Sequence, residues 1–219
     1  MHSQKTRLPS LEFQYLRFLD CEDSAAFIRS ISQRYTLPTL ERLAEMGRTN
    51  TRRGAILALS FLGDYRQNAV LGRALHDNDR GVRMLADNGI RELWRRDGNM
   101  VQRRALANIV RLNTGERWTD VVRLTTRLID DAPWFAEIWN QRAIALFSLR
   151  NFEASANDCH QTLELNPYQF PAAVGMGHCY LEMEDGLAAL ECFRRALKLN
   201  PDLEEVRAQV DYLQRSLES

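Results

Sequence analysis

The chain has 219 residues, and its 29 basic and 29 acidic side chains give a formal net charge of zero at pH 7. Its contents of 45% hydrophobic and 26% charged residues are typical of a folded domain, which excludes wholesale disorder and a collagen-like structure. Apolar runs such as Ala55–Leu59 are far shorter than the roughly 18 residues that a membrane-spanning helix needs, so we expect no membrane segment.

The first residues and the cysteines both favour a cytoplasmic protein. Residues Met1–Ser10 contain Lys5 and Arg7 but no apolar segment of a secretory signal behind them. The cysteines form no CxxC pair and are too few for a disulfide framework, so they are expected to be free thiols: Cys21, Cys159, Cys179 and Cys192. Apolar residues recur mostly at intervals of three and four between spaced prolines and glycines, which predicts an all-α fold.

The N-terminal half has a period of 31 residues. Five positions repeat in this phase: Leu40 with Leu71, Arg52 with Arg83, Ala55 with Ala86, Leu59 with Ile90, and Leu62 with Leu93. Two helix pairs are therefore expected, and Asp79 and Arg83 are expected to hydrogen bond between repeats. The segments 51–64 and 79–86 resemble short HEAT repeats of bilin-lyase-like proteins. Residues 1–47 keep the phase only at Ile28 and Ile31, so they are predicted to be a degenerate first repeat or cap.

The boundary between the halves is expected near Asp97-Gly98-Asn99, because glycine and asparagine can end one helix and start another. This divides the chain into residues 1–98, with the HEAT-like repeats, and residues 99–219.

The C-terminal half has a period of 34 residues, marked by Pro133, Pro167 and Pro201. A proline ends a helix, so each period predicts one helical hairpin. Two units resemble the tetratricopeptide (TPR) pattern, through Trp139, Ala143, Leu146, Phe152, Cys159 and Pro167, and then Gly177, Tyr180, Ala189, Phe193, Ala196 and Pro201. The resemblance covers roughly residues 102–217. It implies a right-handed helical-hairpin solenoid in which HEAT-like repeats precede about three TPR units and a capping helix that starts near Leu203.

The TPR resemblance also implies a concave groove lined by the first helix of each hairpin. The implied partner-binding residues are Leu106, Val110, Asn113, Asn140, Ile144, Phe147, Val174, His178 and Leu181. Family members that bind chaperone tails clamp a terminal carboxylate with lysine, asparagine and arginine. The corresponding residues here are Leu106, Val110, Gln141, Pro171 and Gly175, which argues against chaperone docking. An alternative is that an N-terminal segment covers the groove within the chain through Leu11, Tyr15, Phe18 and Leu19.

Other clusters are weaker. Cys159-His160 and His178-Cys179 invite a zinc site, but adjacent helical residues point about 100 degrees apart, so we expect no metal. No nucleophile elbow, zinc-protease motif or phosphate-binding loop is present, so we expect neither an enzyme nor a cofactor. Six arginines surround Trp94 near the boundary, which makes nucleic-acid binding a disfavoured alternative: Arg91, Arg95, Arg96, Arg103, Arg104 and Arg111.

The leading hypothesis is a non-catalytic protein–protein interaction scaffold, whose groove takes a helix or peptide of an unidentified protein. Its alternatives are nucleic-acid binding at the arginines and a bilin-lyase-like HEAT protein or chromophore handler.

Overall fold

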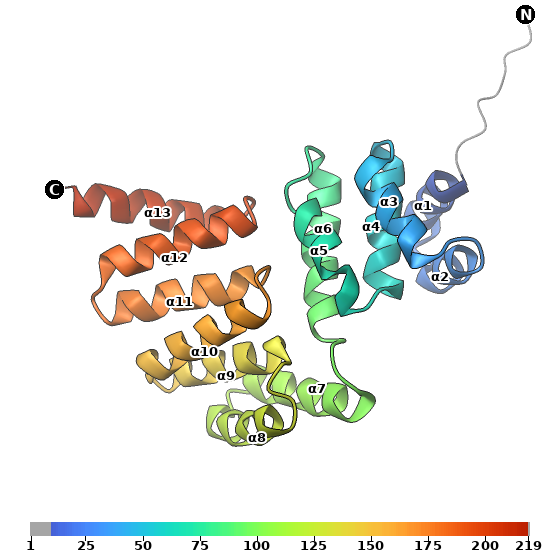
Figure 1. Ribbon diagram of the computed structural model, residues 1–219. Coiled ribbons are helices and arrows are strands. Elements are labelled where there is room, and N and C mark those ends of the chain that lie inside the picture. The colour runs from blue at the N-terminus through green and yellow to red at the C-terminus, as the bar shows by residue number, and fades with distance from the viewer. Residues whose placement is uncertain (1–9, 219) are drawn as a thin grey trace, which may run out of the picture. The chain divides into compact units, whose positions relative to one another are not determined.

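The computed structural model describes residues 10–218 and divides the chain into two compact units, Met1–Leu93 (unit 1) and Trp94–Ser219 (unit 2). The described residues are helical, without a β-strand, so the all-α prediction is confirmed (Figure 1). None of the described helices is long and apolar enough to cross a membrane.

Unit 1 contains the helices of the 31-residue period. They are α1 (Ser10–Cys21), α2 (Ser24–Ser32), α3 (Leu37–Met46), α4 (Thr49–Leu62), a short 3-10 helix η1 (Tyr65–Gln67), α5 (Asn68–Ala74) and α6 (Arg80–Trp94), which ends one residue beyond the unit. The apolar periodic positions are buried except for the half-buried Leu62, and Leu40, Leu71, Leu59 and Ile90 are among the fully buried side chains. A pattern that repeats in burial is expected when each period contributes one helix pair to a shared core.

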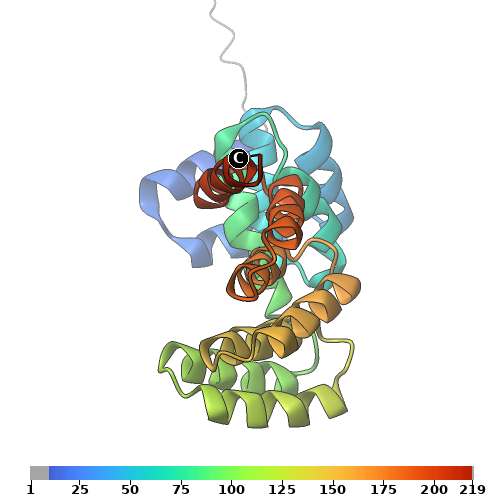
Figure 2. The same ribbon diagram turned by 90° about the vertical axis from the view of Figure 1, so that its left-hand side faces the viewer.

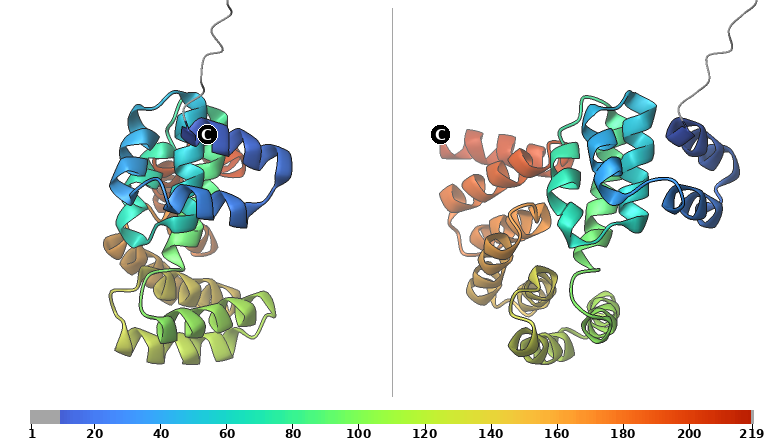
Figure 3. Two further views of the ribbon diagram at one scale, coloured as in Figure 1. Left: turned by 90° about the vertical axis from the view of Figure 1, so that its right-hand side faces the viewer. Right: turned by 45° about the vertical axis from the view of Figure 1, so that its right-hand side comes forward.

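Helix α1 packs on α4 and α2 within unit 1 (Figure 3). Leu11 and Tyr15 are buried, and a Cβ atom added at Gly54 of α4 would lie 3.0 Å from the Tyr15 Cβ. The Phe18 ring lies 5.4 Å from that of Phe27 between centroids. Of the residues in the alternative that an N-terminal segment covers the TPR groove, Leu11 and Tyr15 are buried inside unit 1 and Phe18 packs on Phe27 there, whereas Leu19 is 52% exposed.

Unit 2 is a series of helical hairpins and an end helix, which can be followed from green to red in Figure 2. The hairpins are α7 (Met100–Thr114) with α8 (Trp118–Asp131), α9 (Ala136–Ser148) with α10 (Phe152–Leu165), and α11 (Phe170–Glu182) with α12 (Gly186–Leu199); α13 (Glu204–Leu217) follows. Each periodic proline lies just after the second helix of a hairpin, as the sequence predicts. The predicted core positions Thr125, Cys159 and Phe193 are all buried.

The turns inside the hairpins repeat as well. Glu116, Arg150 and Glu184 have positive φ angles of 58, 61 and 63 degrees, and they stand 34 residues apart between the two helices of each hairpin. Each turn is closed by the next residue, whose N–H donates to a carbonyl five residues back, as Asn151 does to Leu146. The same turn therefore sets the same hairpin geometry three times.

The connection between α6 and α7 contains Gly98 at a φ of +80 degrees and Asn99, whose side chain accepts hydrogen bonds from Val101 N and Gln102 N. The contact division falls a few residues earlier, between Leu93 and Trp94. Trp94 is buried, and its ring meets that of Phe170 at a tilt of 63 degrees with centroids 5.6 Å apart. This aromatic contact lies within unit 2.

Candidate functional site

The candidate site is a pocket of about 280 Å³ between the second and third hairpins, which we call the groove pocket. It is lined by α9 (Asn140, Ala143, Ile144, Phe147, Ser148), α10 (Ser155, Cys159) and α11 (Pro171, Val174, Gly175, His178). Five of the nine groove residues predicted from the sequence come together here. No charged side chain lines this pocket.

The apolar wall consists mainly of Ile144, Phe147 and Val174. Ile144 keeps 45% of its surface exposed, which is a large value for an isoleucine beside a core. Phe147 is only half-buried, since one side of its ring packs on Phe152 with centroids 5.3 Å apart and a tilt of 59 degrees. Exposed apolar surface in a concave site is the part that gains free energy when a ligand covers it.

His178 stands at one end of the groove pocket between two aromatic rings. Its imidazole centroid lies 6.4 Å from that of Phe147 and 5.2 Å from that of Phe193. Burial lowers the pKa of His178 below its ordinary value of 6.5, against a smaller opposing effect of Glu182. The imidazole is therefore neutral at pH 7, so this end of the pocket carries no positive charge.

The floor of the groove pocket is open because residue 175 is glycine. A Cβ atom there would lie 3.3 Å from the Cys159 Sγ. Burial raises the pKa of the Cys159 thiol, so the group is a neutral, weakly polar surface rather than a nucleophile. His160 points elsewhere and lies 4.0 Å from Glu164, so the adjacent cysteine and histidine do not share a site.

Next to the groove pocket lies a buried polar cluster around Glu137. Its carboxylate accepts hydrogen bonds from Gln141 Nε2 at 2.7 Å, from Gln169 Nε2, and from Asn140 Nδ2 at 3.3 and 3.4 Å. Burial raises the pKa of Glu137, while these three amides and the charge of Arg95 oppose the shift. The cluster ties the start of α9 to the loop before α11.

Four predicted groove residues lie outside the pocket. Leu106 is 1% exposed and packs in a core with Ile129, Ala132, Phe135 and Ile138, so the prediction that it contacts a partner is wrong. Val110 packs partly buried against the same core, and Leu181 packs against the core of the third hairpin. Asn113 donates to the carbonyl and Oε1 of Gln141 at 2.9 and 2.8 Å, so its amide serves helix packing.

Sequence reasoning missed the contribution of α10. Ser155 and Cys159 belong to the second helix of their hairpin, where the TPR pattern predicts core side chains, yet both also line the groove pocket. The signal that could have pointed to them is Gly175, because a residue without a side chain on the facing helix opens a path to the layer behind it.

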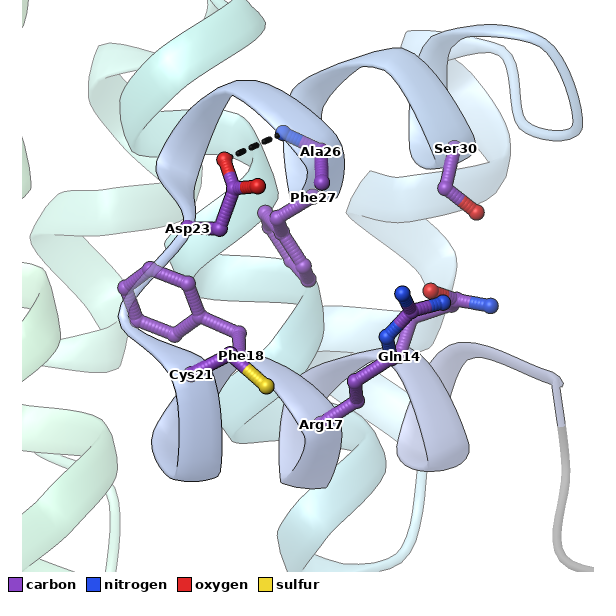
Figure 4. A pocket seen from close by; sticks show the side chains of 8 residues that line it. All are labelled: Gln14, Arg17, Phe18, Cys21, Asp23, Ala26, Phe27 and Ser30. Atoms are coloured by element: carbon purple, nitrogen blue, oxygen red, sulfur yellow. Dashed lines mark hydrogen bonds between the residues drawn. The ribbon is translucent and has the colours of Figure 1, made fainter.

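A second hollow, of about 160 Å³, lies between α1 and α2 in unit 1 (Figure 4). Its lining is partly apolar and partly polar, because it includes the Phe18 and Phe27 rings together with Arg17 and the exposed Cys21. Asp23, at its edge, is occupied as the cap of α2, since it accepts a hydrogen bond from Ala26 N at 2.9 Å. This smaller, mixed surface offers no continuous apolar wall.

The six arginines near the boundary are divided between the two units. Arg91, in unit 1, pairs with Asp87 at 3.2 Å, and Arg111, in unit 2, donates to Asn108 Oδ1 at 2.8 Å. Arginines that already bind neighbours on their own helix are less available to bind the phosphates of a nucleic acid.

Comparisons with known proteins agree with this architecture. Residues 171–203 match the tetratricopeptide repeat family. The first TPR domain of Spaghetti, solved with an Hsp90 peptide, is 20% identical with a TM-score of 0.50, over 52% of this chain and 91% of that one. The TPR2B domain of yeast Sti1, solved in a pHsp70 complex, is 21% identical with a TM-score of 0.51, over 54% of this chain and 99% of that one. A search of curated proteins found no match.

At these identities the solved structures show the fold. The helical hairpins share the fold of these TPR domains, and residues 171–203, within the 34-residue period, match a tetratricopeptide repeat.

Proposed function

We propose that the protein is a non-catalytic interaction scaffold whose groove pocket binds a segment of a partner protein. The observation that carries the proposal is the exposed Ile144 in an apolar, concave site of about 280 Å³. The hairpins hold α9 and α11 rigidly, so binding requires little ordering of the site. We also propose that the protein acts in the cytoplasm.

The solved relatives support the general activity, since Spaghetti and Sti1 were solved with chaperone peptides. The chaperone tails themselves are not carried over to this chain. The positions of the carboxylate clamp hold Leu106, Val110, Gln141, Pro171 and Gly175, which provide no cation. We therefore propose a protein partner with a different binding segment.

The test is capture of partners from the native host with the wild-type chain and two variants. Ile144→Asp places a charge in the groove pocket, whereas Leu187→Asp places one on α12 at another exposed position, 67% exposed and outside the pocket lining. Both changes are expected to leave the melting temperature nearly unchanged, because neither side chain fills the core.

Proteins captured by wild type and by Leu187→Asp, but lost with Ile144→Asp in quantitative mass spectrometry, support the groove pocket. A central apolar anchor is worth about 2 kcal/mol or more, roughly thirtyfold in affinity. The same captured proteins with all three chains would contradict the proposed site.

A further inference from the structure

The groove pocket contains one nearly buried polar group with an unused acceptor. Asn140 is 7% exposed and lines the pocket. Its Nδ2 donates to both Glu137 oxygens, and within residues 10–218 no hydrogen bond is made to its Oδ1. The Oδ1 atom is not fully enclosed either, and it belongs to a residue that lines the pocket. Nearly buried amide oxygens are rarely left without a donor.

The orientation of this amide is set by the buried Glu137. The carboxylate accepts N–H groups from Asn140, Gln141 and Gln169, and it would repel the Asn140 oxygen if the amide were turned around. The Nδ2 atom therefore faces Glu137, and the Oδ1 atom is turned away from the carboxylate, on a residue that lines the pocket. Glu137 acts as a positioning residue for an acceptor that a ligand can use.

The charges around the pocket select against an anionic ligand. No lysine or arginine lines it, and Arg95, the cation that acts on Glu137 beside the pocket, is not among the lining residues. His178, which does line it, is neutral because burial lowers its pKa. A carboxylate entering this space would lose hydration without gaining a cation. A ligand with an apolar body and an N–H group matches both the Ile144 wall and the Asn140 acceptor.

We propose that the groove pocket binds an internal, uncharged segment of a partner chain, with one apolar side chain against Ile144 and Val174 and a neighbouring backbone N–H donating to Asn140 Oδ1. The inference rests on the proposed scaffold function and defines the chemistry of its partner. The size agrees, since an apolar cavity of about 150 Å³ holds a benzene ring and this pocket offers about 280 Å³.

The proposal can be tested on the full chain with three small probes. N-acetyl-phenylalanine amide is uncharged and has N–H donors. N-acetyl-phenylalanine carries a carboxylate instead of the amide, and N-acetyl-N-methyl-phenylalanine dimethylamide keeps the ring but has no N–H group. Titrations are followed by the NMR signals of Ile144 and Val174, because ligands of this size bind in the millimolar range.

The amide probe is expected to bind at least about tenfold more tightly than the carboxylate probe, which has to give up its hydration without gaining a cation. It is expected to bind about three- to tenfold more tightly than the N-methylated probe, which is the effect of one neutral hydrogen bond. Asn140→Ala should abolish the preference for the N–H probe over the N-methylated probe. The matched control Ser148→Ala, also in the pocket lining, should keep it.

The ratio between two probes is measured on the same variant, so a loss of stability in Asn140→Ala does not imitate the expected result. Equal binding of the amide and carboxylate probes, a preference that survives Asn140→Ala, or no binding of any probe would overturn the proposal. If Ile144→Asp still removes captured partners in that case, the scaffold function stands and only the ligand chemistry is wrong. If Ile144→Asp also leaves the captured partners unchanged, both the scaffold function of the groove pocket and the proposed ligand chemistry are wrong.

Discussion

The core of unit 2 depends on close approaches between single residues. Phe193 on α12 is fully buried and points its ring at α11, where residue 177 is glycine. A Cβ atom at Gly177 would lie 2.6 Å from the Phe193 Cε1, well inside van der Waals contact. Glycine at this position therefore lets the two helices of the third hairpin pack at their observed distance.

Gly177→Ala is expected to lower the free energy of unfolding by about 1 to 3 kcal/mol, because the Phe193 ring has to move in a packed core. The loss occurs although alanine favours a helix over glycine by about 1 kcal/mol. Urea unfolding followed by circular dichroism measures it.

Gly175→Ala on the same helix is the matched control. Its added carbon meets the Cys159 Sγ at 3.3 Å, beside an open pocket rather than a ring. Its free energy of unfolding should stay within about 1 kcal/mol of wild type, since helix propensity offsets the contact. Equal losses in the two variants would contradict the assigned packing of Phe193.

At the scale of elements, two arginine–aspartate pairs in unit 1 join α4 to the segment that precedes α6. Arg53 donates to both oxygens of Asp79 at 2.7 Å, and Arg52 does the same with Asp77. Asp79 also accepts a hydrogen bond from Val82 N at the start of α6. The sequence predicts a pair between Asp79 and Arg83, but the Asp79 carboxylate is bound by Arg53, and Arg83 donates to the carbonyl of Asp77.

Asp79→Asn should make stability depend less on pH. The Arg53 hydrogen bonds lower the pKa of Asp79 from 3.8 to about 2. A lowered acid pKa stabilises the fold above pH 3.8, and this contribution disappears as the pH falls through about 2. The variant should therefore lose about 1 to 2 kcal/mol at pH 7 and nothing below pH 2, because asparagine can still cap α6.

Urea unfolding from pH 2 to 7 measures this difference. The exposed Asp211 on α13 offers a control, since Asp211→Asn is expected to follow wild type across the range. A difference between Asp79→Asn and wild type that is the same at pH 2 and pH 7 would show that the charge of Asp79 is not the cause.

At the scale of the whole molecule, unit 2 has its own buried core. In unit 2 the large clusters around Phe193 and Phe135 contain residues of that unit only. Trp94, its first residue, covers Phe170 from the N-terminal side. A part of a chain with its own core can fold alone.

Residues 94–219 are therefore expected to fold as an isolated fragment, with helical circular dichroism and one cooperative thermal transition. Trp94→Ala in the fragment should lower its melting temperature, because the buried ring leaves a cavity beside Phe170. Leu217→Ala should leave the melting temperature of the fragment unchanged, because the Leu217 side chain is exposed. A fragment that melts without cooperativity would contradict the independence of unit 2.

The periods in the sequence determined the helices, their hairpins and the ends of those hairpins at Pro133, Pro167 and Pro201. This much is encoded locally, because a helix is fixed by apolar spacing and by residues that end it. The same periods predicted the burial of Phe193 and of the unit 1 positions such as Leu40.

Only the tertiary structure decided which groove positions are open. Leu106 and Asn140 occupy the same place in successive repeats, yet Leu106 is covered by Ile129 and Phe135, whereas Asn140 borders a pocket that Gly175 leaves empty. The physical reason is that exposure and hydrogen bonding depend on side chains from other helices, tens of residues away. A repeat pattern gives the position of a residue on its helix, and its neighbours decide whether a ligand can reach it.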